Sequence, residues 1–241
     1  MKFLIRFLFP IYVYLFFYPL AIAWMVLSSI SAIIFALAFG QKAGSFVGRI
    51  WAQGTCLLSF VWVTVSGKEH LSKTQSYVFV ANHASAYDIY SMYGFLGRDI
   101  RWMMKKELMR TPFLGYACKK VGHISVDRSN AVKAAETIET AGKLLHEGAS
   151  VIFFPEGSRT RTGKIGTFKR GAFVTAQEIG LPVVPVTING SFDIMKPGNT
   201  TFYPGCISLT IHPPLVLKSQ NREELLEEMN KVRDIIDKGL K

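Results

Sequence analysis

The chain has 241 residues, with 28 lysines and arginines against 17 aspartates and glutamates, and a net charge of +11. This length suits one domain of ordinary size with a small extension. The charge favours an anionic partner such as a membrane surface or an acidic substrate. The sequence contains no recognition-helix, RRM or zinc-finger pattern, so we do not expect a nucleic acid partner. Cys56, Cys118 and Cys206 are far apart and lack metal-ligand spacing, which argues against a disulfide framework and a bound metal.

The N-terminal run of residues 3–39 is mostly apolar, and Arg6 is its only charged residue. It is too long for the apolar core of a signal peptide, which spans about 7–15 residues. As one straight helix it would measure about 55 Å, against a hydrocarbon core of about 30 Å. Pro10 and Pro19 lie inside the run, and each is predicted to interrupt a helix because proline lacks a backbone N–H.

Both flanks of this run are basic, with Lys2 before it and Lys42 and Arg49 after it. The positive-inside rule then places both ends on the cytoplasmic side. We therefore expect residues 1–58 to form a membrane-associated helical hairpin, re-entrant or half-embedded, at the cytoplasmic face (the inner membrane of a bacterium). A signal sequence or plain anchor and a single tilted span remain alternatives.

The remainder, residues 59–241, alternates between strand and helix patterns. Strands are expected at 60–65, 77–81, 100–104, 123–126, 150–154, 183–188 and 206–211. Helices are expected at 88–97, 114–121, 129–148, 168–178 and from 221 onward. In the last helix, Asn221 and Glu224 form a capping box, and the side predicted to be buried carries Leu225, Met229, Val232 and Ile236. This alternation predicts an α/β fold with a central mixed β-sheet flanked by helices, preceded by a membrane-embedded two-helix segment.

His83 and Asp88 stand five residues apart in the segment Asn82-His-Ala-Ser-Ala-Tyr-Asp88, directly after an expected strand. If Ser85 begins the next helix, His83 lies in the loop and Asp88 in the first helical turn. The carboxylate can then bind one imidazole nitrogen and leave the other to accept a proton. Ser85 and Asp88 also match a capping box, which alone would explain both residues.

A basic glycine turn follows the fifth expected strand, in the segment Phe154-Pro-Glu-Gly-Ser-Arg-Thr-Arg161. Gly157 allows positive φ or the close approach of a ligand. Arg159 can bind a phosphate through two parallel hydrogen bonds, and Glu156 can orient an arginine or a substrate hydroxyl. The alternative is an exposed loop of solvated charges.

Two further basic sites are less specific. Lys105 begins the segment Lys105-Lys-Glu-Leu108, which fits either a hydrogen-bond donor in the site or an amphipathic surface helix. Arg128 fits either a second phosphate ligand or a structural pair with Asp127. The remaining histidines have no partner pattern, and we expect structural or solvated roles for His70, His123, His146 and His212.

These segments resemble the four blocks of the 1-acyl-sn-glycerol-3-phosphate (lysophosphatidic acid) acyltransferases. Asn82 to Asp88 looks like the His-x4-Asp motif, and Phe154 to Arg159 looks like the Phe-Pro-Glu-Gly-Thr-Arg block, with Ser158 in the threonine position. Lys105, Glu107, Leu108, Pro112 and Gly115 look like the second block. Val183-Val-Pro-Val186 looks like the fourth. The four occur in order over roughly residues 75–190, which is far more specific than any one alone.

The resemblance implies transfer of a fatty acyl group from acyl-CoA or acyl-carrier protein to the sn-2 hydroxyl of lysophosphatidic acid, giving phosphatidic acid without a metal or cofactor. His83 would act as the general base, Asp88 would orient it, and Lys105 would stabilise the oxyanion. The glycerol phosphate would be bound by Glu156, Gly157, Ser158, Arg159 and Arg128. Membrane lipid is a further expected partner, and no motif specifies an oligomeric state.

Three other functions fit the same residues. The enzyme could act on another lysolipid, such as a lyso-ornithine lipid or lysocardiolipin. It could be a thioesterase, with water in place of the alcohol. A non-catalytic membrane lipid-binding protein is the third, although it would not need His83 and Asp88 together.

Overall fold

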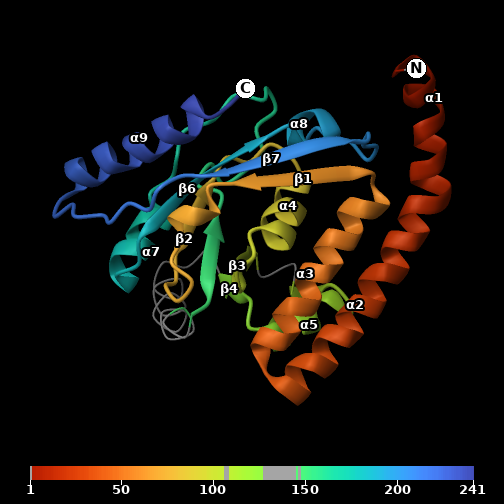
Figure 1. Ribbon diagram of the computed structural model, residues 1–241, viewed down its shortest axis with the longest axis horizontal. Helices are drawn as coiled ribbons and strands as arrows, with labels where there is room; N and C mark the ends of the chain where they lie inside the picture. Colours follow the sequence, from red (N-terminus) through yellow and green to blue (C-terminus); the bar gives the residue numbers. More distant parts are fainter. Residues whose placement is uncertain (1, 106–108, 127–144, 146–147) are drawn as a thin grey trace.

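The computed structural model describes residues 2–105, 109–126, 145 and 148–241. It consists of a β-sheet with helices on both faces and a pair of long N-terminal helices at one end (Figure 1). The predicted Arg128, Glu107 and Leu108, and most of the predicted helix 129–148, lie outside the described residues.

One seven-stranded sheet runs through the α/β part, in the order β1-β7-β6-β2-β5-β3-β4. Its strands are β1 (Val61–Ser66), β2 (Val78–Ala81), β3 (Ile100–Lys105), β4 (Ile124–Val126), β5 (Ser150–Phe153), β6 (Val183–Asn189) and β7 (Gly205–Ile211). Neighbouring strands are parallel except for the antiparallel pair β6 and β7. The sheet is therefore mixed, which confirms the predicted fold class.

The helices of this part are α4 (Tyr87–Phe95), α5 (Leu114–Val121), α7 (Gly171–Ile179), α8 (Ser191–Ile194) and α9 (Arg222–Lys238), with a short 3-10 turn η2 (Lys68–His70). Helix α7 begins three residues later than predicted, and the short helix α8 was not predicted. Helix α9 matches closely: the Asn221 side chain caps the backbone N–H groups of Glu223 and Glu224. Its buried residues are Leu225, Met229, Val232 and Ile236, as predicted.

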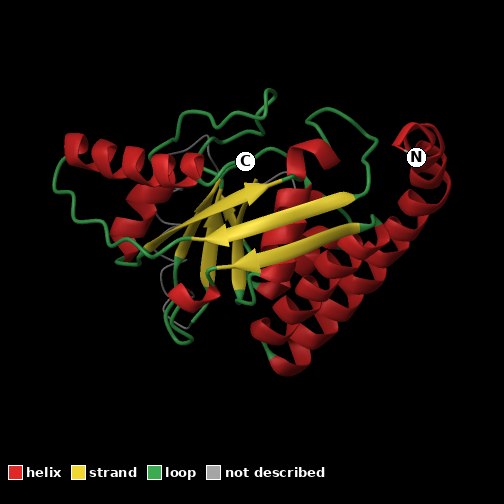
Figure 2. Cartoon of the chain, turned by 45° about the horizontal axis from the view of Figure 1, so that its top comes forward, coloured by secondary structure: helices red, strands yellow, loops and turns green. Residues whose placement is uncertain are grey.

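The two faces of the sheet bury two separate cores, because successive side chains of a strand point to opposite faces. In β2, Phe79 and Ala81 belong to the core beneath α3 and α4, whereas Val78 and Val80 belong to the core beneath α7 and α9. All of these side chains are fully buried. Figure 2 shows the helices on both sides of the sheet.

The N-terminal run differs from the prediction. Helix α1 (Lys2–Tyr12), a π-helical turn η1 (Val13–Phe17) and helix α2 (Tyr18–Phe39) follow one another without a break. The expected interruptions at Pro10 and Pro19 are therefore wrong. The wider π-helical turn, closed by the Tyr18 N–H on the Val13 carbonyl, directly precedes Pro19 and accommodates its missing N–H.

The hairpin turn lies at Gly40, where φ is +87°, and not within residues 3–39. Helix α3 (Gln41–Leu58) is the second arm and packs along α2 (Figure 1). This arm lies within the predicted hairpin of residues 1–58, but it has no continuous apolar run and its bounds were not predicted. The two helical arms thus occupy residues 2–58 with a turn later in the chain than expected.

The first arm presents an apolar surface that the fold does not cover. Residues Phe7–Phe39 are long and apolar enough to cross a membrane, with a mean hydropathy of 2.3 and 17% of the apolar window buried. Large side chains such as Leu15, Ile22 and Leu37 are more than half exposed. A soluble protein rarely exposes so large an apolar surface, so this arm is suited to contact with lipid.

Candidate active site

The predicted site lies where two neighbouring parallel strands end. Val80 of β2 pairs with Phe153 of β5, so the two carboxyl ends are level. His83 follows β2 and Phe154 follows β5. Their rings stack with centroids 4.0 Å apart and planes 11° apart. The sheet thus places His83 at its carboxyl edge, where open α/β sheets bind their ligands.

His83 and Asp88 are in direct contact. The Nδ1 atom of His83 lies 2.8 Å from Oδ2 of Asp88. The same oxygen accepts the backbone N–H groups of Ala84 at 2.6 Å and Ser85 at 2.8 Å. Asp88 is fully buried and His83 is 13% exposed. Because a carboxylate accepts hydrogen bonds, Nδ1 carries the hydrogen, and Nε2 is left as the acceptor.

The start of α4 shows that both interpretations of this segment hold in part. The residue before the helix is Ala86 and not Ser85. The Ser85 hydroxyl accepts the Tyr87 N–H at 3.3 Å and donates to the Met195 carbonyl at 2.8 Å. Asp88 still binds the Ser85 N–H, as a capping box requires. One carboxylate therefore both orders the turn and orients the imidazole.

Glu156 joins this turn to the basic loop. Its Oε1 accepts the backbone N–H of His83 and its Oε2 accepts that of Gly166, both at 2.8 Å. Burial raises the pKa of Glu156, and the hydrogen bonds from His83 and Gly166 oppose this rise. Glu156 therefore holds two backbone segments together, a contact that the sequence did not predict for this residue.

The basic loop lies directly against His83. The Thr160 N–H donates to the His83 carbonyl at 2.9 Å, which places the backbone of Arg159 close to His83. Gly157 has a φ of +77°, and a Cβ atom there would come within 2.7 Å of the Lys169 ammonium nitrogen. The side chains of Ser158 and Arg159 are exposed to solvent, where they can meet a ligand.

Arg233 of α9 is a residue of this site that the sequence did not indicate. Its Nε donates to the Gly166 carbonyl at 3.2 Å, and the N–H of the same glycine binds Glu156. The C-terminal helix is thereby connected to His83 through two intervening residues. Arg233 stands on a half-buried position of an amphipathic helix, and nothing in its local pattern distinguishes it from a solvated charge.

Lys105 is the last residue of β3. That strand pairs in parallel with β5, with Trp102 opposite Ile152, so its carboxyl end lies at the same edge as His83. The Trp102 ring also stacks on Phe154 at 6.0 Å. The backbone of Lys105 is therefore on the site side of the sheet, whereas its side chain and Arg128 lie outside the described part of the chain.

The other described histidines have structural surroundings. Burial holds the pKa of His123 at about 3, so its imidazole is neutral beneath Tyr93 and Trp102. His70 binds the Ile211 carbonyl at 3.0 Å, and His212 binds the Thr187 hydroxyl at 2.9 Å. His146 is outside the described residues.

Comparisons with known proteins agree with this geometry. Residues 62–189 match the Acyltransferase family. A 1-acyl-sn-glycerol-3-phosphate acyltransferase of Pseudomonas aeruginosa is 30% identical over 189 residues, which cover 74% of this chain and 72% of that protein. The chloroplastic enzyme LPAT1 of Arabidopsis thaliana is 31% identical over 80% of this chain, but the match spans only 56% of its own length.

A solved structure extends the similarity to nearly the whole chain. The 1-acyl-sn-glycerophosphate acyltransferase PlsC from Thermotoga maritima superposes with a TM-score of 0.81 at 26% identity. The match covers 95% of this chain and 93% of that one. The N-terminal helices and α9 therefore belong to an architecture that this chain shares with that enzyme.

Proposed function

The chain belongs to the 1-acyl-sn-glycerol-3-phosphate acyltransferase family, and from this premise we propose that it acylates the sn-2 hydroxyl of 1-acyl-sn-glycerol-3-phosphate. The product is phosphatidic acid, a precursor in phospholipid synthesis. The acyl donor is a thioester, either acyl-CoA or acyl-carrier protein. The observation that carries this proposal is the His83–Asp88 pair at the sheet edge, 2.8 Å apart.

In the proposed mechanism, Nε2 of His83 accepts the proton of the sn-2 hydroxyl while Asp88 holds the imidazole and balances the charge that develops on it. The freed oxygen attacks the thioester carbonyl carbon. The tetrahedral intermediate then collapses, the C–S bond breaks, and the leaving sulfur takes the proton from His83. The alcohol of the substrate is the nucleophile, so no serine or cysteine is needed.

The segment Phe154–Arg159 is proposed to bind the phosphate of the acceptor. Arg159 supplies the charge, and its position is supported by the hydrogen bond from the neighbouring Thr160 to His83. Gly157 and Ser158 offer backbone and hydroxyl donors beside it. Lys105, at the same sheet edge, is proposed to stabilise the oxyanion through its side chain or a neighbouring amide, and Arg128 is proposed as a further phosphate ligand.

We also propose that the protein is bound to the cytoplasmic face of a membrane by its N-terminal helices. The Tyr12 hydroxyl binds the Leu58 carbonyl at 2.7 Å, and the Tyr18 hydroxyl binds the Thr200 carbonyl at 2.5 Å. These contacts support an N-terminus on the same side as the α/β part. Reporter tags at Met1 and Lys241 should both be cytoplasmic, and an N-terminal tag on the opposite side would contradict this orientation.

The reaction is tested by mass spectrometry of the products that the purified protein forms in lipid micelles. Lysophosphatidic acid and palmitoyl-CoA are supplied, and His83→Ala is the control. Phosphatidic acid from the wild type alone would support both the reaction and the base. Equal product from the His83→Ala variant would exclude the mechanism.

The donor and acceptor are then varied in the same assay. Acyl-carrier protein replaces acyl-CoA, and lysocardiolipin or a lyso-ornithine lipid replaces lysophosphatidic acid. A higher kcat/KM with one of these acceptors would assign the enzyme to that lysolipid. Release of free fatty acid without any acceptor would identify a thioesterase.

A further inference from the structure

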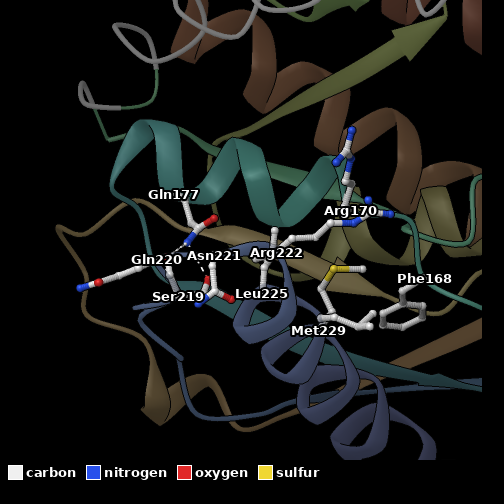
Figure 3. Close-up of a pocket in the computed structure, with 10 residues that line it drawn as sticks. Phe168, Arg170, Gln177, Ser219, Gln220, Asn221, Arg222, Leu225 and Met229 are labelled. Carbon is white, nitrogen blue, oxygen red and sulfur yellow. Dashed lines mark hydrogen bonds between the residues drawn. The ribbon is translucent and has the colours of Figure 1, made fainter.

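A pocket of about 490 Å³ lies between helices α7 and α9, and the mechanism above assigns it no role (Figure 3). Its volume is within the range of sites for small molecules and cofactors. It is lined by Phe168, Arg170, Gln177, Ser219, Gln220, Asn221, Arg222, Leu225, Leu226 and Met229. None of the residues proposed for catalysis or for phosphate binding is among them, so this is a separate site.

The pocket carries positive charge that the described residues do not balance. Arg170 precedes α7 and Arg222 begins α9, and both side chains are exposed. Neither forms an ion pair within the described part of the chain, and no acidic residue is among the lining residues. The carboxylate of Glu224 at the start of α9 is occupied by the N–H groups of Gln220 and Asn221. An anion is the ligand that this charge favours.

The walls of the pocket combine a fixed polar rim with an apolar floor. The Gln177 amide donates to the Ser219 carbonyl at 2.8 Å and to its hydroxyl at 2.7 Å, which ties the end of α7 to the start of α9 (Figure 3). Phe168 and Met229 are buried at the floor. A ligand with both an anionic group and an apolar or aromatic ring fits this combination.

The position of the pocket indicates a water-soluble ligand. Figures 1 and 2 place α7 and α9 at one end of the molecule and the apolar N-terminal helix at the other. One wall of the pocket is nevertheless connected to the loop beside His83. Lys169, between the lining residues Phe168 and Arg170, donates its N–H to the Pro155 carbonyl at 2.8 Å.

We propose that the α7–α9 pocket binds the phosphate-bearing nucleotide end of acyl-CoA. This inference rests on the proposed function, in which the donor is the soluble anionic substrate and the acceptor is a lipid. Arg170 and Arg222 bind the phosphates, and the aromatic base of the nucleotide lies over the apolar floor of the pocket. In this proposal the pantetheine arm runs from the pocket to His83 past Lys169, whose N–H binds the Pro155 carbonyl.

Binding is tested by calorimetry with unacylated CoA, with dephospho-CoA and with inorganic phosphate. The double variant Arg170→Gln/Arg222→Gln is compared with Lys231→Gln, an exposed cation of α9 that does not line the pocket. We expect CoA to bind the double variant at least tenfold more weakly than the wild type. The Lys231→Gln variant should bind CoA with the affinity of the wild type. The wild type should also prefer CoA to dephospho-CoA, a preference that the double variant loses. Unchanged CoA affinity in the double variant would overturn the proposal.

Steady-state kinetics separates this inference from the proposed function. The double variant should show a higher KM for palmitoyl-CoA, with little change in kcat or in the KM for lysophosphatidic acid. A higher KM for acyl-carrier protein alone would overturn the nucleotide assignment and identify the carrier protein as the occupant. If the wild type binds CoA through these arginines but forms no phosphatidic acid, the pocket stands and the proposed reaction fails.

Discussion

The two segments that form the active site are held in place by different means. The turn that carries His83 is ordered from within, since Asp88 binds the His83 ring and the backbone of Ala84 and Ser85. The loop of residues 154–170 has an internal hydrogen bond between Glu156 and Gly166, but it is also held from outside, by His83 and by Arg233 of a distant helix. The conformation of the His83 turn thus depends mainly on a few neighbouring residues, whereas that of the loop also depends on contacts with distant parts of the fold.

The largest effect on activity is expected when the turn that carries His83 loses the negative charge of Asp88. Asp88→Asn keeps the shape but removes the carboxylate that orients His83 and stabilises the imidazolium. We expect kcat to fall about 10²- to 10⁴-fold, the usual contribution of general base catalysis, with little change in the KM for either substrate. Rates are measured with lysophosphatidic acid and palmitoyl-CoA, and circular dichroism checks the fold. A kcat within a few-fold of wild type would contradict the role of Asp88.

A change in the exposed part of the loop should act on binding. Arg159→Ala removes a charge-assisted hydrogen bond to the phosphate, worth about 1.5–3 kcal/mol. The KM for lysophosphatidic acid should therefore rise roughly 10- to 100-fold, with a smaller change in kcat. A monoacylglycerol, which lacks the phosphate, is the matched control substrate and should be used equally well by both proteins. A selective rise in the KM for the thioester would assign Arg159 to the donor instead.

A more distant change tests whether the loop depends on the fold around it. Arg233→Met removes one hydrogen bond to Gly166, worth about 0.5–1.5 kcal/mol, and we expect kcat/KM to fall by up to about tenfold. Arg233→Gln, which retains a donor, should recover part of the activity. Lys231→Met on the same helix is the control. Equal kinetics for the Arg233→Met and Lys231→Met variants would show that α9 does not position the loop.

The smallest effect concerns Glu156, which joins the two segments. Burial raises its folded-state pKa above the ordinary value of 4.5, so the folded protein binds this proton more tightly than the unfolded chain. The contribution of Glu156 to stability is then fully present below the ordinary pKa and is lost as pH rises through the folded-state pKa. The wild type should therefore gain stability relative to Glu156→Gln as pH falls toward the ordinary pKa. The melting temperatures of both proteins in micelles are measured at a series of pH values. A difference between them that does not change with pH would contradict this prediction.

The difference between the two segments also explains what the sequence could predict. The predicted strands and helices of the α/β part lie within three residues of their observed bounds wherever the structure describes them, and α8 and η2 were not predicted. The contact between His83 and Asp88 was predicted because it depends on one turn. The contact of Arg233 was not predicted because it depends on how α9 packs against the rest of the fold. The backbone contacts of Glu156 were not predicted because they depend on how the segments after β2 and β5 meet at the sheet edge.

The prediction of breaks in the N-terminal helix was wrong for a different physical reason. Local propensity predicted a break at Pro10 and Pro19, but the chain continues through a π-helical turn and reverses only at Gly40. Helix α3 mixes polar and apolar residues without a long apolar run, and it packs against α2 and α4. Tertiary contacts here outweigh the intrinsic preferences of the residues.

The stacking of His83 on Phe154 affects the charged state of the base. The imidazole lies face to face with an aromatic ring at 4.0 Å, within the distance at which a cation is attracted to the ring face. In the proposed mechanism His83 takes the substrate proton, and this contact then becomes a cation–π interaction, worth about 0.5–2 kcal/mol at a partly desolvated site. Phe154 thus offers a π face to the positive charge that develops during the proposed reaction, so an apolar residue of the Phe154–Arg159 segment takes part through its π electrons.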